Sequence, residues 1–600
     1  MPSRALLAAL LFAAPLAAQE TLFQQQPDPK SNTRVEAVAL FSRPSPGGFL
    51  PVRVTVTNAG EQDGDITLRC VANDGNYGGE GSEMNSSYKL DAPAGKSTKH
   101  DILIPCNTLL NYGYASLGTT NVTVTMSGSF GANSGSVSGS YLHDQPAVLL
   151  SEPLYTPNAS TLDSQLSSSG RSSGYGAINF AGKFDPREMP EDWRAYSGYD
   201  GIGMTDGDWG LLSPGARNAI LRWNRLGGQI VIYAQSANSD LATLGISNLA
   251  SGQKSAQRSF GSVSIVPAGG SLSFSTDQAD EMIARFKSKD NLPPLNSAIR
   301  GDFSSSWPLQ IDFGNEGYNY MLFILILIGF GVLVGPVNLF VFAKSGQRHR
   351  LFITTPIIAL GTSLLLVVLI IVIDGFGGRG ARVALMEVRP DDGENSAYIF
   401  QEQVSRTGVL LGGGFGVGEP AAITPVPLAS SQWSRLTDRN NGGGMRYEAN
   451  LRDNKLEVDG DWFQSRSEQG QLVRAIVPTR GRIELRSTSG PPSLISTFDF
   501  PIEKIYYRDS SDVYWCAENI ERGKAFEPRQ VQPTEVLSFV NEAKSKLSTR
   551  SKEALSKLSP LERGDRHFIA VSAAAPGIDT FKGIEWKETK TFITGPVALP

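Results

Sequence analysis

The chain has 600 residues, of which 40 % are apolar and 19 % are charged, and its formal net charge is −5. This length predicts several domains, and the absence of a basic excess excludes a protein that works by neutralising nucleic-acid phosphates. The 3 Cys and 4 His residues are too few for a dense disulfide scaffold and show no zinc-ligand spacing. We therefore expect no metal and no cofactor.

Residues 1–18 have the pattern of a secretory signal peptide. Arg4 gives a positive start, Ala5–Ala14 is a short apolar run, and the small residues up to Ala18 suit cleavage before Gln19. About ten apolar residues are too few to cross a bilayer as a helix. We expect the segment to export the N-terminal part of the chain.

Residues 20–145 show the two-residue period of β-strands. Val52–Thr57 alternates apolar and polar residues and ends at the turn Asn58–Gly60, and Asn121–Met126 alternates again. Several short strands separated by turn signals predict a β-sandwich of the immunoglobulin-like type.

Two cysteines fall on the apolar faces of predicted strands in this sandwich, Cys70 and Cys106. In an exported domain these residues are candidates for a disulfide, and the alternative is two separate buried thiols. Cys516 follows Trp515 in an apolar run and is expected to be a buried, inert thiol.

In residues 146–290 strands and helices alternate. Tyr199–Thr205 is predicted as a strand and Asp206–Trp209 as the loop after it. Ser213-Pro214 then begins a helix, with serine as N-cap and proline in the first turn, and Gln229–Ala234 is the next strand. Strand, helix and parallel strand form a right-handed crossover, so this part should be a doubly wound α/β domain.

The runs "YDGIGMTDGDW" and "LGGQIVIYA" in this domain resemble the strand, loop, helix and nucleophile strand of the class I glutamine-amidotransferase-like (flavodoxin-like) domain. The chain is more similar to degenerate copies of that domain in uncharacterised bacterial membrane proteins, where a "GPVN" membrane helix follows. Here Gly335–Asn338 read Gly-Pro-Val-Asn. The resemblance covers about residues 146–375 and implies an extracytoplasmic domain ahead of a membrane helix.

The residues that the amidotransferase chemistry needs are missing. The nucleophile position is a Cys on the tight turn after the second strand, with a His as its base. The turn here reads Gln235-Ser236-Ala237, and no histidine lies between His143 and His349. Ser236 would have no imidazole base, so we expect no catalytic residue. The G-x-S-x-G match at 170–174 sits in a polar, loop-like stretch.

Asp206 and Asp208 follow a predicted strand at its carboxyl end, where α/β domains bind ligands. One interpretation is a cation or polar-ligand site that includes Ser236. The other is a solvated turn whose carboxylates favour the start of the next helix.

Residues 320–373 contain two runs without a charged side chain, Met321–Ala343 and Leu351–Ile373. Each is long enough to cross a hydrocarbon layer of ~30 Å as a helix. The loop between them, Lys344–Arg350, has basic residues and no acidic one, which predicts a cytoplasmic loop. We expect a two-helix hairpin in the bacterial inner membrane, with lipid as its partner and both flanking parts periplasmic.

Four residues of the first run are candidates for helix packing. Gly331 and Gly335 form a G-x-x-x-G pair that lets a second helix approach closely, either the other span or the same face of a homodimer. Pro336 frees a backbone carbonyl, and Asn338 can bond to the neighbouring helix. No charged residue lies inside either run, which disfavours an ion path.

Residues 291–319 are predicted as a linker whose aromatic residues, among them Trp307, suit the membrane interface. Residues 376–600 are predicted as a β-rich extracytoplasmic domain with one helix, Thr534–Leu547, capped by Thr534. Gly412–Gly418 is glycine-rich but lacks the Lys-Ser/Thr of a phosphate loop, so we interpret it as a plain loop.

Together these patterns predict a multidomain α+β membrane protein: β-sandwich (20–145), doubly wound α/β domain (146–290), linker (291–319), transmembrane hairpin (320–373) and β-rich domain (376–600). The favoured function is a non-catalytic envelope protein that binds a protein partner or ligand outside the cytoplasm. The alternatives are an accessory subunit of a membrane transport system and a divergent amidase or hydrolase.

Overall fold

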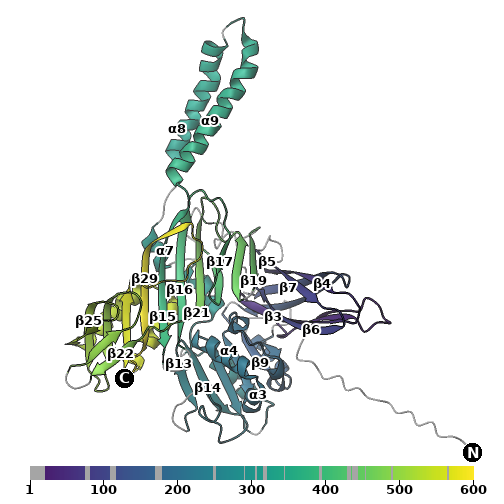
Figure 1. Cartoon of the computed structure of the whole chain (residues 1–600), viewed down its shortest axis with the longest axis vertical. Coiled ribbons are helices and arrows are strands. Elements are labelled where there is room, and N and C mark those ends of the chain that lie inside the picture. The colour runs from purple at the N-terminus through teal and green to yellow at the C-terminus, as the bar shows by residue number, and fades with distance from the viewer. Residues whose placement is uncertain are drawn as a thin grey trace, which may run out of the picture. The chain divides into compact units, whose positions relative to one another are not determined.

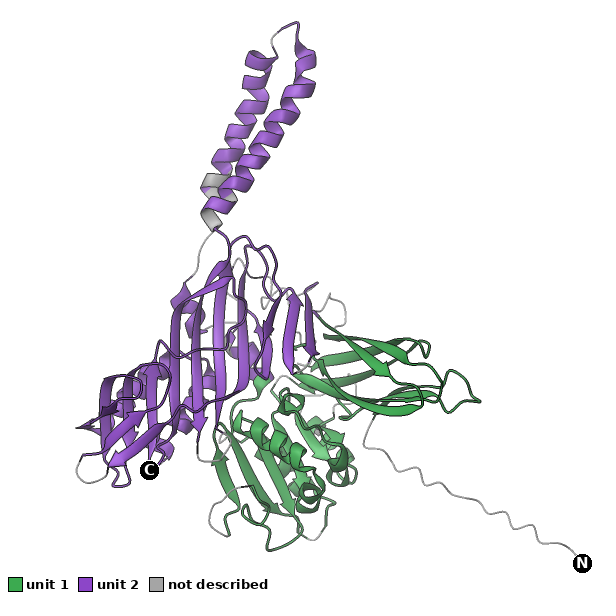
Figure 2. Cartoon of the chain, viewed as in Figure 1, with its two compact units in different colours: residues 1–77, 84–295 green, residues 78–83, 296–600 purple. Residues whose placement is uncertain are grey.

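The structure is a computed structural model of the chain, and it describes residues 20–74, 82–108, 117–142, 144–168, 179–246, 252–269, 271–288, 291–303, 307–314, 320–343, 345–390, 395–428, 431, 434, 444–452, 454–487, 491–563 and 566–599. It is a multidomain, sheet-rich α+β protein with two long apolar helices (Figure 1). Contacts divide it into two compact units, residues 1–77 with 84–295 and residues 78–83 with 296–600 (Figure 2). The predicted signal peptide lies outside the described residues.

The first unit begins with two antiparallel groups of strands. One sheet has the order β1-β2-β3-β6, and the other group has the order β5-β4-β7-β8. The strands are β1 (Glu20–Gln25), β2 (Arg34–Ala39), β3 (Phe49–Asn58), β4 (Gly64–Asp74), β5 (Glu83–Ala92), β6 (Lys96–Pro105), β7 (Leu117–Gly128) and β8 (Asn133–Leu142).

Alternation along these strands builds the interior that the sequence predicts. Val52, Val54 and Val56 of β3 are buried, and the residues between them are half-buried. Tyr88 of β5 donates its hydroxyl hydrogen to the carbonyl of Leu103 in β6, which joins the two groups of strands. This arrangement is compatible with the expected β-sandwich.

Cys70 and Cys106, the candidates for a disulfide, are free, buried thiols in this structure, which is the alternative that the sequence analysis left open. Cys70 lies on β4, whereas Cys106 follows β6 in the other sheet. Burial raises the pKa of each thiol to about 12, although hydrogen bonds involving Ser86 and Ser45 oppose the shift. Both groups are therefore protonated and act as small apolar residues.

The α/β part of the first unit has a sheet of order β10-β9-β11-β12-β14-β13, in which the first five strands are parallel and β13 is antiparallel. Its elements are β9 (Val148–Ser151), α1 (Glu152–Tyr155), α2 (Ala159–Ser168), β10 (Ala181–Phe184), η1 (Pro186–Glu188), η2 (Trp193–Tyr196), β11 (Gly201–Thr205), α3 (Asp206–Leu211), α4 (Pro214–Arg225), β12 (Gln229–Ala234), β13 (Ser255–Arg258), β14 (Gly261–Pro267) and α5 (Thr276–Phe286).

The unit β11–α4–β12 forms where the sequence predicts it. The Ser213 hydroxyl accepts a hydrogen bond from the N–H of Ala216 at 3.1 Å and caps α4. Gly227 closes the helix with a φ of 95°, and a side chain at Gly228 would meet the Trp223 ring at 2.4 Å. The chain therefore needs two glycines to turn tightly from helix to strand.

The second unit begins with α6 (Leu295–Phe303) and α7 (Pro308–Phe313), where the sequence analysis expected a linker. Trp307, expected at the membrane interface, is 1 % exposed instead. Its ring meets that of Phe303 edge to face with centroids 4.8 Å apart, and its indole N–H donates to Glu402. The expected interfacial position of Trp307 is wrong, because aromatic residues beside a membrane span and buried ones look alike in sequence.

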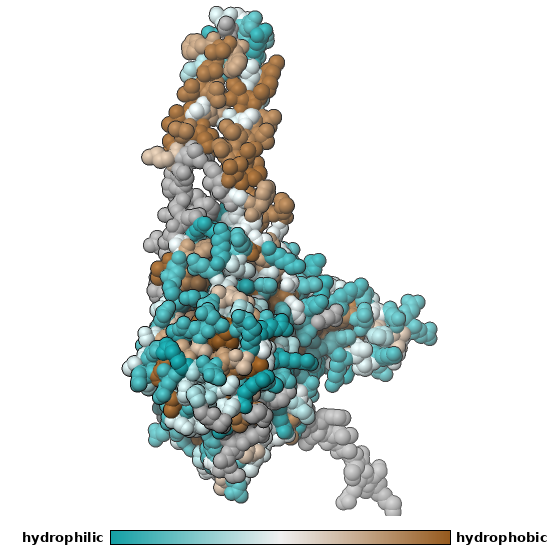
Figure 3. Space-filling model, turned by 60° about the vertical axis from the view of Figure 1, so that its left-hand side comes forward, coloured by the Kyte–Doolittle hydropathy of each residue, from teal (hydrophilic) through white to brown (hydrophobic). Residues whose placement is uncertain are grey.

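Two long apolar helices follow, each long and apolar enough to cross a membrane. The first consists of α8 (Tyr320–Val332) and the π-helix η3 (Leu333–Phe342), and the second consists of η4 (Arg348–Arg350) and α9 (Leu351–Asp374). Their side chains are largely exposed, and Figure 3 shows them as a continuous hydrophobic surface. We call these helices the hairpin.

The rest of the second unit contains a nine-stranded sheet of order β18-β21-β16-β15-β29-β28-β24-β25-β27, a three-stranded sheet β22-β23-β26 and the ladder β17-β20-β19. The strands are β15 (Gly378–Arg389), β16 (Ser396–Thr407), β17 (Phe415–Val417), β18 (Ala421–Val426), β19 (Arg446–Arg452), β20 (Lys455–Gly460), β21 (Glu468–Pro478), β22 (Ile483–Ser487), β23 (Ser493–Ser496), β24 (Ile502–Arg508), β25 (Tyr514–Ile520), β26 (Ala525–Phe526), β27 (Arg529–Val531), β28 (His567–Ser572) and β29 (Ile584–Pro596).

Helices α10 (Pro533–Ser545), α11 (Thr549–Leu558) and α12 (Pro560–Arg563) accompany this sheet. The predicted helix Thr534–Leu547 corresponds to α10, and α11 and α12 are additional. Gln532, not Thr534, precedes the first turn of α10, because Pro533 occupies the first helical position. The glycine-rich run after Gly412 includes the short strand β17.

Candidate functional site

The carboxyl ends of β11 and β12 are the site that the sequence analysis singled out. The segment after β11, predicted as a loop, is the short helix α3. Thr205 caps this helix, and its hydroxyl accepts the N–H of Asp208 at 3.0 Å. The Asp208 carboxylate accepts the N–H of Thr205 at 3.0 Å in return, which completes a capping box.

Asp206 points across to the turn that follows β12. Its carboxylate accepts hydrogen bonds from the backbone N–H groups of Gln235 at 3.0 Å and Ser236 at 3.1 Å. It also accepts the N–H of Gly207 at 3.1 Å and the hydroxyl of Ser239 at 2.6 Å. These four donors lower the pKa of Asp206 below its usual value, against the opposing effect of partial burial.

Asp206 therefore occupies the first two backbone amides of the turn that follows β12. The structure brings Asp206 and Ser236 together as predicted, but through the Ser236 backbone rather than its hydroxyl. That hydroxyl accepts the N–H of Asn238 at 3.3 Å. No histidine lies among residues 144–288 that the structure describes, so no imidazole base reaches Ser236 there.

Asp208 turns the other way and is 4 % exposed. Besides capping α3, it accepts the hydroxyl hydrogen of Ser151 at 2.6 Å, at the end of β9. Both aspartates thus join α3 to the ends of neighbouring strands. Asp208 caps the helix, as in the second interpretation from the sequence, but it is buried rather than solvated. Within the described residues, no group of three His, Cys, Asp or Glu side chains is placed to hold a metal ion. The G-x-S-x-G match at 170–174 lies outside the described residues.

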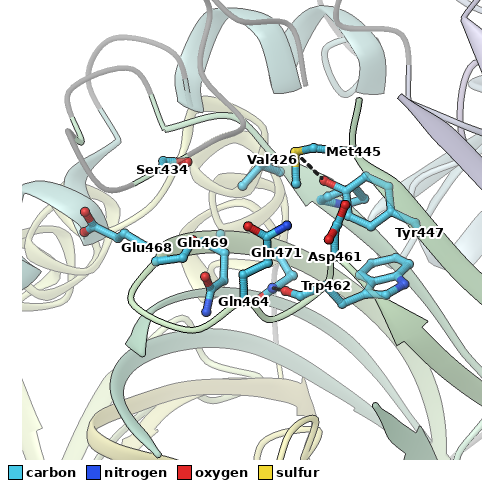
Figure 4. A pocket seen from close by; sticks show the side chains of 13 residues that line it. Val426, Ser434, Met445, Tyr447, Asp461, Trp462, Gln464, Glu468, Gln469 and Gln471 are labelled. Carbon is cyan, nitrogen blue, oxygen red and sulfur yellow. Dashed lines mark hydrogen bonds between the residues drawn. The ribbon is translucent and has the colours of Figure 1, made fainter. Parts of the chain in front are cut away.

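A polar pocket opens in the second unit near Tyr447 and Trp462, whose rings meet edge to face at 5.1 Å (Figure 4). Its volume of about 20 Å³ suits one buried water rather than a substrate. Gln464 and Gln469 each place a buried amide oxygen there without a hydrogen-bond partner. The pocket is consistent with a hydration site inside the fold, because such oxygens need a donor.

A wider cleft of about 490 Å³ lies beside the start of β28 and the end of β29. Its lining contains the basic residues Arg482, Arg566 and His567, but no carboxylate, hydroxyl or thiol side chain. Arg482 pairs with Glu484 at 2.6 Å. The cleft could accept an anionic group, and its lining supplies no carboxylate, hydroxyl or thiol nucleophile.

One buried carboxylate, which the sequence analysis did not identify, joins segments of the second unit that are far apart in the sequence. Glu402 of β16 is 1 % exposed. It accepts the indole N–H of Trp307 at 2.8 Å and both the hydroxyl (2.5 Å) and the N–H (3.3 Å) of Ser548, which precedes α11. Burial raises the pKa of Glu402, although these hydrogen bonds oppose the shift. The residue ties the segment before α7 and the start of α11 to the same strand.

Asn338 joins the two helices of the hairpin, as the sequence predicted. It is fully buried, its amide donates to the Thr355 hydroxyl at 2.9 Å, and its carbonyl oxygen accepts the Thr354 hydroxyl at 2.6 Å. The π-helix around Pro336 accommodates the missing backbone donor. The Thr354-Thr355 pair, polar in an apolar run, was the signal in the sequence for this contact.

The glycine pair does not pack against the second helix. A side chain at Gly331 or Gly335 would meet nothing within 4 Å, and the same holds for Gly361. The predicted packing of this pair on the second span is therefore wrong, because the Asn338 contact sets the facing sides of the helices.

Asn338→Val is expected to loosen the hairpin by about 1 kcal/mol, the usual strength of a polar contact between membrane helices. Spin labels on Leu339→Cys and Ile353→Cys would report this loss as a broader distance distribution in the purified protein. Gly335→Ala is the matched control and should leave the distribution unchanged. An unchanged distribution in Asn338→Val would show that these hydrogen bonds do not hold the helices together.

Comparisons with known proteins assign no family. No protein-family model and no curated protein matches the chain. Among solved structures, a cycloisomaltooligosaccharide glucanotransferase from Paenibacillus sp. is 13 % identical over 33 % of this chain and 27 % of that one, with a TM-score of 0.15. A calcium-binding mutant of β-glucuronidase 2 from Bacteroides uniformis is 10 % identical over 36 % and 22 %, with a TM-score of 0.13. At these TM-scores the likenesses carry no argument about fold or function.

Proposed function

We propose that the chain is a non-catalytic bacterial envelope protein, anchored in the inner membrane by the hairpin, whose periplasmic domains bind a protein partner. The observation that carries the proposal is the hairpin itself. Its two helices expose large apolar side chains along their length, which water disfavours and a bilayer accommodates. The arginines of η4 at its tip favour a cytoplasmic loop.

The non-catalytic part of the proposal is supported by Asp206. Backbone N–H groups that stabilise a substrate oxyanion must be free to point at it. Here the carboxylate of Asp206 accepts the N–H groups of Gln235 and Ser236. A carboxylate in that position repels an oxyanion, and no histidine in the described part of the domain can serve as a base for Ser236.

Cysteine labelling tests the topology. Gln347→Cys places a thiol in the loop at the hairpin tip, whereas Glu61→Cys and Glu585→Cys place thiols in the two soluble parts, and all three positions are exposed. In intact spheroplasts a membrane-impermeant maleimide should label positions 61 and 585, and position 347 only after permeabilisation. The parent chain is the control, because its three cysteines are buried.

Labelling of position 347 from outside, or protection of positions 61 and 585, would contradict the proposed topology. Crosslinking in native membranes would then address the partner. A single envelope protein recovered with the chain supports the proposal, and recovery with a multi-span permease would favour the transport-subunit alternative.

A further inference from the structure

Two large apolar side chains outside the hairpin, Leu411 and Phe376, are strongly exposed on the described surface. Leu411 is 96 % exposed, more than any other large apolar side chain described, and Phe376 is 65 % exposed. Leu411 lies in the run Gly408–Gly418, which reads GVLLGGGFGVG and contains no polar side chain. Surface loops in water usually carry polar residues with their glycines, so this loop differs from an ordinary turn.

Hydrogen bonds fix this loop to the end of the hairpin. The N–H of Val409 donates to the carbonyl of Gly375 at 2.9 Å, and the N–H of Gly377 donates to the carbonyl of Val409 at 3.2 Å. The N–H of Gly408 donates to the carbonyl of Gly377 at 2.7 Å. Because Asp374 is the last residue of α9, the loop lies directly beside the point where the chain leaves the second long helix.

A second set of contacts holds the other side of the loop. The N–H of Leu410 donates to the Ser465 hydroxyl at 2.9 Å, and that hydroxyl donates back to the carbonyl of Leu410 at 3.3 Å. The N–H of Arg466 donates to the carbonyl of Gly408 at 2.8 Å. The backbone just before Leu411 is therefore fixed by hydrogen bonds, while the Leu411 side chain is exposed. Transfer of such a leucine from water to an apolar environment is favourable.

We infer that Phe376 and Leu411, here called the apolar apex, insert into the outer interface of the lipid bilayer beside the hairpin. The inference rests on the proposed membrane anchoring and adds a docking surface to it. Continuity identifies lipid as the occupant, because the apex is hydrogen-bonded to the residues that directly follow α9. Aromatic and aliphatic side chains at that depth anchor proteins at the interface.

Leu599 provides a matched control within the same unit, since it is an exposed leucine at 55 %. The two leucines lie at opposite ends of β15. Gly378, where β15 begins, pairs with Ile584, and Glu387 near its end pairs with Thr594, so residue 599 lies beyond that far end. A strand of 12 residues spans roughly 40 Å, which is more than the thickness of the interface.

The test uses the full-length protein in vesicles of phosphatidylethanolamine and phosphatidylglycerol. A fluorophore is attached to Leu411→Cys, Leu599→Cys or Leu364→Cys, the last at an exposed position within α9. We expect lipids with a doxyl group near the headgroup to quench the label at 411 strongly and the label at 599 little. Aqueous iodide should show the reverse order. Leu411→Cys should fold, because its side chain packs against little else.

The label at 364 separates the two proposals. If a doxyl group deep in the acyl chain quenches 364, and 411 responds only to iodide, the hairpin is in the membrane and the apolar apex is overturned. If 364 is not quenched by any lipid, the membrane anchoring itself fails, and the apex inference fails with it. Quenching of 411 by headgroup-proximal doxyl lipid together with deep quenching of 364 supports both.

Discussion

Glu402→Ala is expected to destabilise the protein by about 3–5 kcal/mol, because it leaves buried donors unpaired and opens a cavity. The stranded donors are the indole N–H of Trp307 and the hydroxyl and N–H of Ser548. Chemical unfolding of the purified protein in mild detergent measures the change. Glu448→Ala removes an exposed glutamate from β19 and should alter stability by less than about 0.5 kcal/mol.

The pH dependence of Glu402 has a definite sign. Its pKa in the folded protein is raised by burial, above an unfolded value of about 4.3. The folded state therefore binds the proton more tightly, so stability is greatest below that unfolded value and falls as the pH rises through the folded pKa. Glu402→Gln should remove this fall. A fall of equal size in Glu402→Gln would assign it to another group.

A double-mutant cycle isolates the contact with Trp307. Trp307→Phe removes the indole N–H but keeps an aromatic ring against Phe303. If the hydrogen bond at 2.8 Å matters, the combined loss in Trp307→Phe with Glu402→Ala will be smaller than the sum of the single losses. Additive losses would mean that the two side chains act independently.

Asp206→Ala is expected to cost about 2–3 kcal/mol in the stability of the first unit, because hydrogen bonds to a carboxylate are strong and four donors lose their acceptor. Hydrogen exchange at the amides of Gln235 and Ser236 should accelerate in the variant. Ser213→Ala, which removes the cap of α4 and the hydrogen bond from the Ser213 hydroxyl to Glu191, is the matched control and should leave these two amides protected.

Acid should weaken the same turn. The folded pKa of Asp206 is lowered, relative to an unfolded value of about 3.9. Its contribution to stability is therefore present above that value and is lost as the pH falls through the folded pKa. Asp206→Asn should lack this acid dependence. If Asp206→Ala instead abolished the cellular role while stability stayed unchanged, the non-catalytic proposal would be contradicted.

Local signals account for what the sequence predicts well. The ends of α4 are marked by residues with strong local preferences, Ser213-Pro214 at the start and the glycines at 227 and 228 after the end. The unit β11–α4–β12 could therefore be predicted without knowledge of the tertiary structure. The same holds for the hairpin, where charge-free length and the polar Asn338 carry the information. In both cases the partners lie close in the chain.

Long-range partners explain what the sequence does not predict. Glu402 looks like an ordinary strand residue, since its partners Trp307 and Ser548 are 95 and 146 residues away. Cys70 and Cys106 each point into the domain interior. The alternation of apolar and polar residues along a strand does not show which residues of two facing sheets are in contact. The sequence around Asp206 looks the same whether this residue stabilises a turn or binds a ligand. Only the folded structure shows that the amides after β12 donate to its carboxylate.

The tight connection between α9 and β15 has a mechanical consequence. Only Gly375–Gly377 separate the helix from the strand, and β15 pairs along its length with β16 and β29. On the other side, Arg406 of β16 holds the carbonyl of Gly314 at 2.8 Å. A pull along β15 would load these ladders in shear, where many hydrogen bonds between the strands must yield together. A force on the second helix of the hairpin would thus be transmitted directly to the sheet, because no long flexible linker separates α9 from β15.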